Sequence, residues 1–185
     1  FSEDALRILR ALRFAGRFDF QIESATAEAI HRCREDLHRI AAERVFAELK
    51  ELLVSPGCAR LMLEFRDVFA VILPEVEPLF DFDQNNPHHD SDGWHHTART
   101  VAAVRPDVVL RLSALLHDTG KPDCKTRDEA GISHFYGHNR RSKELAHAAL
   151  LRLRCDNDTR LQVETLVGMH DSPMPQTMAQ TRRFL

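Results

Sequence analysis

Apolar residues recur at helical spacing along most of the chain, and no long stretch alternates with the period of a strand. The first helix is expected to start after an N-cap at Ser2 and to end near Arg17, and the second to span 24–35 with Ser24 as its N-cap. Further helices are expected over 42–53, 58–65, 68–73, 94–104, 106–118, 142–153 and 156–170, with the start of another over 177–185. The hydrophobic pattern therefore predicts an all-α fold.

A polar segment over 76–93, rich in Asp, Asn and Pro, interrupts this pattern and favours turns over helix. The chain has 185 residues, 43% of them hydrophobic, which is enough for one large domain or two small ones. We therefore expect one unit over 1–75 and a second over 76–185. Because the chain opens on Phe1 without an initiator Met, we expect it to be a fragment of a longer protein.

Charge and cysteine usage exclude several classes of protein. The formal net charge of -3 provides no bulk basic field, so any RNA contact must come from a local basic patch. Cys33, Cys58, Cys124 and Cys155 form no Cys-x-x-Cys pair, which argues against a zinc ribbon or a disulfide framework and for a reducing cytoplasm. We find no apolar run long enough to span a membrane and no signal peptide.

The candidate chemistry centres on His117 and Asp118, which stand side by side directly after the apolar run 111–116. Burying a carboxylate beside an imidazole is costly unless a positive charge compensates, and a divalent cation supplies one. His96, His138 and His170 each lie at an end of another expected helix. One candidate ligand per helix, repeated over four helices, is what a helical metal site requires, and the alternative is a set of ordinary core and surface histidines.

These residues, with Gly120 and Lys121 behind His117-Asp118, resemble the HD superfamily of metal-dependent phosphohydrolases. The resemblance implies a site with His96, His117 and Asp118 as ligands of one ion, while His138 and His170 hold a second ion or orient the phosphate. Lys121 would neutralise substrate charge, or else act as an ordinary cation at a helix C-terminus. Such ligands accept Mn, Ni, Mg, Zn or Fe.

The match to the HD pattern is incomplete at its end. HD enzymes commonly complete the site with an aspartate on a later helix, and no such residue follows Leu185, so the HD unit is expected to be truncated. Asp171 is the nearest substitute and Asp158 is remoter. His88 and His89 are either auxiliary ligands or part of a surface loop, which is the reading that we favour.

Arginines dominate one side of the first helix, where Arg10, Arg13 and Arg17 share a narrow wedge. A solvated helix face usually mixes the two signs of charge, whereas an arginine stripe suits bidentate contacts to phosphates. The stripe therefore predicts RNA binding, with a solvated face as the alternative.

Motifs along the first unit resemble the RNA-binding neck of bacterial tRNA nucleotidyltransferases, which comprise the CCA-adding enzymes and their poly(A) polymerase relatives. The matching motifs are Phe1-Ser2-Glu3-Asp4-Ala5-Leu6-Arg7, Arg10 to Phe14, Ala41-Ala42-Glu43-Arg44-Val45 with Glu48-Leu49, Leu73-Pro74-Glu75, and Gln84 to His89. The resemblance implies that Asp4 and Arg7, three apart on one helix side, read the edge of an incoming CTP or ATP, and that Arg44 contacts RNA. The alternative for Asp4 and Arg7 is a weak ion pair at a helix start.

The family's catalytic head, with its Gly-Ser motif and paired carboxylates, has no counterpart in this sequence, since Asp81-Phe82-Asp83 lies in a polar loop. We therefore expect no nucleotide transfer by this chain alone. The sequence predicts a C-terminal part of such a protein that binds tRNA or another RNA and hydrolyses phosphoesters, with an RNA 2′,3′-cyclic phosphate as the substrate that the family implies. The alternative is an RNA-binding module with an inert HD fold.

Overall fold

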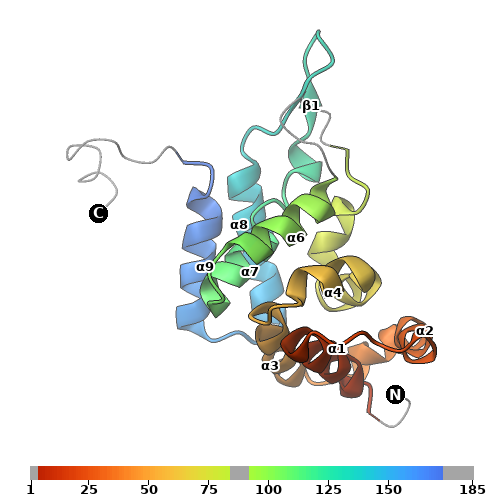
Figure 1. The fold of residues 1–185 in the computed structure, drawn as a ribbon. Helices are drawn as coiled ribbons and strands as arrows, with labels where there is room; N and C mark the ends of the chain where they lie inside the picture. Colours follow the sequence, from red (N-terminus) through yellow and green to blue (C-terminus); the bar gives the residue numbers. More distant parts are fainter. Residues whose placement is uncertain (1–3, 84–91, 173–185) are drawn as a thin grey trace.

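The computed structural model describes residues 4–83 and 92–172, which are helical apart from short connections and one hairpin, so the prediction of an all-α fold is confirmed (Figure 1). The α-helices are α1 (Leu6–Phe18), α2 (Ser24–Cys33), α3 (Ala42–Leu53), α4 (Cys58–Glu64), α5 (Arg66–Ile72), α6 (Gly93–Ala103), α7 (Val108–Leu116), α8 (His138–Arg152) and α9 (Asn157–Met169). The 3-10 helices are η1 (Arg34–Arg39), η2 (Pro74–Leu79) and η3 (Pro122–Cys124). No helix in the described ranges is both long and apolar enough to cross a bilayer.

Side-chain caps define where several helices begin. Asp156 accepts a hydrogen bond from the backbone N of Thr159, as predicted, and α3 has the predicted bounds. The prediction of Ser24 as an N-cap is wrong, because Glu23 precedes it in an extended conformation and accepts from the backbone N of Thr26. Ser2 lies outside the described residues.

Two predicted connections contain regular structure. The start of the expected linker, residues 76–79, belongs to the 3-10 helix η2, because Val76 and Leu79 turn their side chains into the core. The polar stretch before α8 holds an antiparallel hairpin of β1 (Thr126–Arg127) and β2 (Ser133–His134), which projects from one end of the molecule (Figure 1, top). Residues 84–91 and the proline-containing segment after Ser172 lie outside the described residues.

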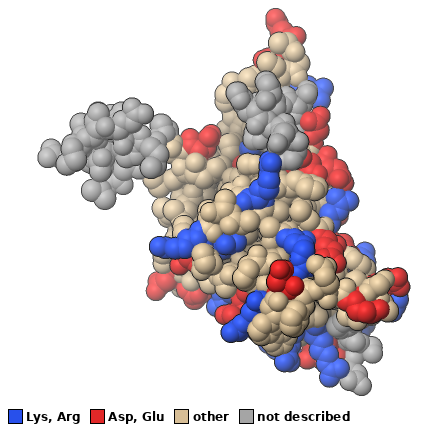
Figure 2. Space-filling model, viewed as in Figure 1, with Lys and Arg blue, Asp and Glu red and all other residues tan. Residues whose placement is uncertain are grey.

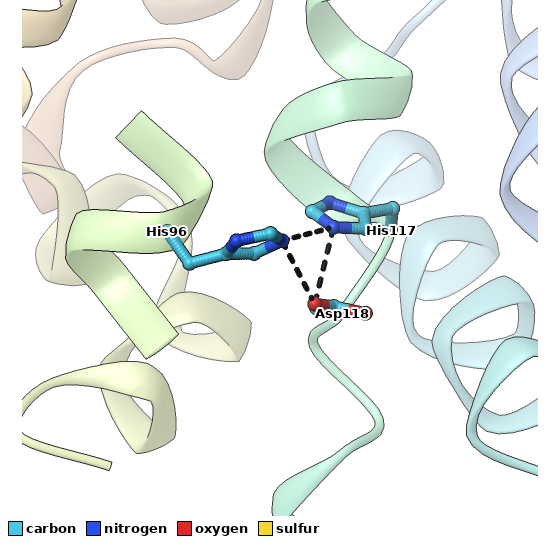
Figure 3. A group of neighbouring side chains, drawn as sticks. All are labelled: His96, His117 and Asp118. Atoms are coloured by element: carbon cyan, nitrogen blue, oxygen red, sulfur yellow. Dashed lines mark hydrogen bonds and ion pairs between the residues drawn. The ribbon is translucent and has the colours of Figure 1, made fainter. Parts of the chain in front are cut away.

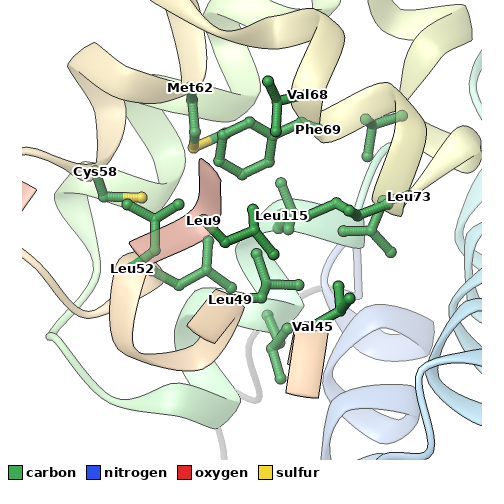
Figure 4. Packing of buried hydrophobic residues seen from close by; sticks show 14 of the residues in the cluster. Leu9, Val45, Leu49, Leu52, Cys58, Met62, Val68, Phe69, Leu73 and Leu115 are labelled. Atoms are coloured by element: carbon green, nitrogen blue, oxygen red, sulfur yellow. The ribbon is translucent and has the colours of Figure 1, made fainter. Parts of the chain in front are cut away.

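One hydrophobic core runs through both predicted units. Leu9 of α1, Leu49 of α3 and Phe69 of α5 pack in the same cluster as Leu115 of α7 (Figure 4). Trp94 at the start of α6 is buried, and its Nε1 donates to the carbonyl of Met62 at 3.0 Å. Burying such side chains is the main stabilising contribution, about 1.5–3 kcal/mol each. The core therefore fixes α6 and α7, which carry candidate ligands, against the N-terminal helices.

An ion pair also joins the two predicted units. Both terminal nitrogens of Arg152 on α8 donate to the carboxylate of Glu75 on η2, at 2.6 and 2.7 Å. Bidentate geometry of this kind is the most favourable for an arginine–carboxylate pair. The two predicted units therefore share one hydrophobic core, and the boundary at residue 75 stays a prediction about function.

Candidate metal centre

Four helices bring candidate ligands to one point, and we refer to His96, His117, Asp118, His138 and His170 as the His/Asp cluster. His96 points from the second turn of α6 towards His117 and Asp118, which follow the end of α7 (Figure 3). His138 is the first residue of α8, and His170 directly follows α9. The position of His117 and Asp118 just beyond a helix end lets consecutive side chains reach the same point.

The first half of the cluster comprises His96, His117 and one oxygen of Asp118. The two Nε2 atoms lie 3.3 Å apart. Oδ2 of Asp118 lies 3.1 Å from Nε2 of His117 and 3.5 Å from Nε2 of His96. Ligand atoms about 2.1 Å from one ion are about 3.0 Å apart at a right angle and about 3.4 Å apart at the tetrahedral angle. These spacings therefore fit three ligands of a common ion.

The second half uses the other oxygen of Asp118. Nε2 of His138 and Nε2 of His170 lie 3.1 Å apart, and each is 3.5 Å from Oδ1 of Asp118. The two groups of candidate ligands thus share one carboxylate, with a histidine pair facing each of its oxygens. This arrangement has room for one ion or for two ions bridged by Asp118.

Backbone contacts fix which ring nitrogen faces the cluster. Nδ1 of His117, His138 and His170 lies 2.8, 2.8 and 2.7 Å from the carbonyls of Ala114, Phe135 and Val167, respectively. A carbonyl only accepts, so each Nδ1 carries the hydrogen and, in the neutral ring, each Nε2 presents a lone pair. In the neutral rings of His138 and His170, two lone pairs therefore face each other, which a cation between them stabilises.

Burial and charge tune the titration of the cluster. Asp118 is 2% exposed. Burial disfavours its charged form, but hydrogen bonds from His117 and His170 and the charge of Lys121 outweigh that effect and hold its pKa below the ordinary range. Burial lowers the pKa of His138, which favours the neutral, ligating form at pH 7. Burial acts in the same direction on His170, but its hydrogen bond to Asp118 prevails and raises the pKa.

Lys121 lies against the cluster. Its Nζ is 2.7 Å from Oδ2 of Asp118, and its side chain is 10% exposed. Nζ also lies 5.5 Å from the ring centroid of Phe135. A largely buried ammonium at this point compensates the carboxylate and can attract an anionic substrate.

Gly120 allows the turn after α7 to lie directly on the start of α8. Its backbone N donates to Oγ of Ser142 at 2.9 Å. A Cβ at this position would meet the backbone N of Ser142 at 2.6 Å and the carbonyl of His138 at 2.7 Å. Since real Cβ atoms do not approach backbone so closely, only glycine fits here. The close packing brings Asp118 and His138 together.

The remaining metal candidates lie elsewhere. The two groups of candidate ligands found among the described residues include neither Asp158 nor Asp171. Asp81 of the Asp-x-Asp spacing pairs with Arg66 at 3.0 Å. His88 and His89 lie outside the described residues.

The nucleotide-reading pair inferred from the family lies at the start of α1. Oδ1 of Asp4 accepts from the backbone N of Leu6 at 3.1 Å, and Oδ2 pairs with Arg44 at 3.3 Å. Arg7 is exposed on the next turn. The fold therefore joins the motif of Asp4 and Arg7 to that of Arg44, although the two are 40 residues apart.

The arginine stripe divides into two kinds of residue. Arg10 and Arg17 are exposed, whereas Arg13 donates from Nε to Glu48 of α3 at 2.6 Å and is only 16% exposed. The sequence did not predict this inward pairing, which ties α1 to α3.

An exposed aromatic strip beside the stripe was missed in the sequence. Phe14, Phe18 and Phe20 are 40%, 53% and 62% exposed. The Phe14 and Phe18 rings are parallel with centroids 6.1 Å apart, and the guanidinium of Arg13 lies 4.2 Å from the Phe14 centroid. The alternation of Phe and Arg at helical spacing was the available signal. Elsewhere basic and acidic side chains are interspersed over the described residues of the face seen in Figure 2.

The fold and the His/Asp cluster together define an all-α protein with groups that can hold a metal ion. Residues 19–80 match the sequence model of a family described as "Probable RNA and SrmB-binding site of polymerase A". The match covers α2 to η2 and the connection before them.

Curated relatives extend the similarity over nearly the whole chain. An A-adding tRNA nucleotidyltransferase of Deinococcus radiodurans is 36% identical over 98% of this chain and 45% of the relative. A CC-adding tRNA nucleotidyltransferase of Thermus thermophilus is 35% identical over the same shares, and a multifunctional CCA protein of Azoarcus is 36% identical over 86% of this chain and 40% of the relative. The chain belongs to the tRNA nucleotidyltransferase and poly(A) polymerase family and corresponds to its C-terminal part. It spans under half the length of these relatives.

Proposed function

We propose that the His/Asp cluster is an HD-type centre that binds a divalent metal ion and hydrolyses phosphoesters. The observation that carries the proposal is the pair of Nε2 atoms of His138 and His170, 3.1 Å apart and both opposite Oδ1 of Asp118. The same arrangement recurs with His96 and His117 at Oδ2. Neutral imidazoles and a carboxylate suit borderline and hard metals.

The residues of the cluster and Lys121 would have separate roles in the hydrolysis. A bound divalent ion supplies an activated water and polarises the phosphoryl group. Backbone carbonyls orient His117, His138 and His170 so that Nε2 faces the centre. Lys121 stands beside Asp118 as a fixed positive charge for the phosphate oxygens. His96 and His170 are 26% and 21% exposed, so the cluster opens to solvent on their side.

The substrate class that the family resemblance implies is an RNA-terminal 2′,3′-cyclic phosphate. The purified chain, loaded with Mn or Ni, is expected to open 2′,3′-cyclic AMP, and a chelator is expected to stop the reaction. Asp118→Asn should abolish it, because this change removes the shared ligand with little change in volume. Hydrolysis that survives both the chelator and Asp118→Asn would contradict the proposal. Metal-free, inactive protein that still binds tRNA would favour the alternative of an inert HD fold.

We propose, second, that α1 and the segment after it form an RNA-binding surface, with tRNA as the partner. The match of residues 19–80 to an RNA-binding family and the exposed Arg10, Arg17 and aromatic strip support it. Aromatic rings flanked by arginines suit stacked bases of single-stranded RNA, at about 1–3 kcal/mol per base. Phe18→Ala is therefore expected to weaken binding of a CCA-ended oligonucleotide, and unchanged affinity would contradict the role of the strip.

We propose that Asp4 and Arg7 read a nucleotide only in the longer protein. We propose that Arg44 holds Asp4 in position, since they pair at 3.3 Å. The longer protein carrying Arg44→Ala should lose discrimination between nucleotides before it loses tRNA affinity. An unchanged nucleotide preference would contradict this positioning role.

A further inference from the structure

We infer that the cavity of about 330 Å³ beside the His/Asp cluster receives the organic part of the phosphoester, and that it selects a nucleobase with an exocyclic amino group over one with an oxo group. This inference rests on the proposed phosphohydrolase function and names its substrate more closely.

The cavity adjoins the cluster directly. Its wall comes from α6 and the residue after it, from α7 and from α9, through Thr100, Val104, Leu110, Ser113, Ala114 and Leu166. His117 and His170, one from each half of the cluster, complete the wall. A phosphate held at the cluster therefore has its ester substituent at the mouth of this cavity.

Size and polarity limit what the cavity can take. A volume of 330 Å³ is at the lower end of small-ligand pockets, which suits one nucleoside. Among the residues that the structure describes, the lining side chains include neither an arginine nor a lysine, so a polyanionic strand gains no charge compensation from them. The wall therefore fits the single terminal base of a nucleotide or of an RNA end.

Each polar hydrogen of the lining side chains already has an acceptor. Thr100 donates from Oγ1 to the carbonyl of His96 at 2.9 Å, and Ser113 from Oγ to the carbonyl of Val109 at 2.7 Å. The Nδ1 hydrogens of His117 and His170 go to carbonyls as well. Because a hydroxyl has one hydrogen, Thr100 and Ser113 offer a ligand acceptor lone pairs as long as these two hydrogen bonds are kept.

This one-sided polarity distinguishes the bases. An exocyclic amino group, as in adenine or cytosine, donates to a hydroxyl lone pair. The oxo group at the same place in hypoxanthine or uracil needs a donor and would face the hydroxyl lone pairs instead, which costs binding free energy. Discrimination against a group left unpaired in a site of this kind is about tenfold or more.

The test compares substrates that differ at this group. The loaded chain should hydrolyse the 2′,3′-cyclic phosphates of adenosine and cytidine with kcat/KM about tenfold above those of inosine and uridine. Ser113→Ala should reduce that ratio, and Leu166→Ala should raise KM with kcat little changed. Leu161→Ala is the matched control, since this leucine of α9 is 53% exposed and does not line the cavity. Equal rates for amino and oxo substrates, or equal effects of the two leucine variants, would overturn the inference.

A second readout is independent of the reaction. Ligand-observed NMR on the metal-free chain should show adenosine binding more tightly than inosine, and Leu166→Asp should abolish this binding while Leu161→Asp should not. Equal binding of the two nucleosides would contradict the inference about the cavity, whatever the result of the hydrolysis assays. If no cyclic phosphate were hydrolysed, that result would instead contradict the proposed function. Hydrolysis of a base-free methyl riboside 2′,3′-cyclic phosphate as efficiently as the adenosine ester would contradict the inference and leave the proposed function standing.

Discussion

Nζ of Lys121 lies 2.7 Å from Oδ2 of Asp118, the same oxygen that faces His96 and His117. The ammonium is no metal ligand, but it places a fixed positive charge directly beside the cluster. Lys121→Met should therefore lower kcat/KM for a cyclic phosphate about 100-fold while the metal content stays at the wild-type level.

Lys125→Met is the matched control for this experiment. Lys125 lies four residues on, and its Nζ contacts the carbonyl of Asp83 and the ring of Phe82 instead of the cluster. Its variant should keep full activity. A Lys121→Met protein that lost its metal, or that hydrolysed the substrate at the wild-type rate, would show that Lys121 has a different role.

The exposed arginines of α1 predict a change in the salt dependence of RNA binding. Arg10→Ala with Arg17→Ala should lower the slope of log affinity against log salt by about 1.5 to 2 units, measured by titration with tRNA. Arg13→Ala should instead lower thermal stability, because Arg13 pairs with Glu48. Arg140→Ala, at an arginine of α8 that is 88% exposed, is the control. A slope that is the same in the double variant and the control would indicate that Arg10 and Arg17 form a solvated helix face and do not contact RNA phosphates.

Glu164 on α9 predicts a pH-dependent contribution to stability. Its Oε1 lies 2.6 Å from Arg160 and 2.9 Å from His147. Burial would raise the pKa of Glu164, but these two partners outweigh burial and lower it below its ordinary 4.5. A carboxyl with a lowered folded-state pKa stabilises the fold above its unfolded-state pKa, and this stabilisation is lost as the pH falls through the folded-state pKa.

Glu164→Gln should thus destabilise the metal-free chain by about 1–3 kcal/mol at pH 7 and by much less near pH 3, as measured by urea unfolding. Glu144→Gln, at a glutamate on α8 that is 51% exposed, should have little effect at either pH. A loss of stability for Glu164→Gln that is as large near pH 3 as at pH 7 would contradict the pairing.

The chain alone should not add nucleotides to tRNA. The Asp-x-Asp spacing considered for this role is Asp81-Phe82-Asp83, and Asp81 is engaged by Arg66 through two hydrogen bonds. Incorporation of labelled CMP or AMP into tRNA lacking its 3′ end should stay at background. Incorporation that Asp81→Asn abolished would overturn this prediction.

Local sequence rules predicted the helices well where caps and periodicity agreed. Helix α3 was found from its apolar spacing alone, and the start of α9 was found because Asp156 caps the segment that the apolar spacing marks as helical. The Ser24 cap failed because Glu23, one residue earlier, reaches the same backbone N–H groups. The hairpin of β1 and β2 was missed because two residues per strand are too few to show a period of two.

The cluster's membership could be predicted, but its geometry could not. One His or His-Asp per helix indicated a shared site, yet only tertiary packing decides that the two histidine pairs face opposite oxygens of Asp118. The neighbouring cavity could not be predicted from the sequence either, because Thr100, Ser113 and Leu166 come from three helices with no common motif. Arg13 turns inward because α3 places Glu48 beside it, which the sequence of α1 does not contain.

The metal content per chain, measured by elemental analysis of purified variants, tests the central claim most directly. His95→Ala is the matched control for His96→Ala, since His95 is 53% exposed and contacts Asp92 outside the cluster. We predict at least about one divalent ion per chain in the wild type and in His95→Ala, and a stoichiometric loss in His96→Ala and Asp118→Asn with the helical circular dichroism unchanged. A folded Asp118→Asn chain that retains the wild-type metal content would contradict the account.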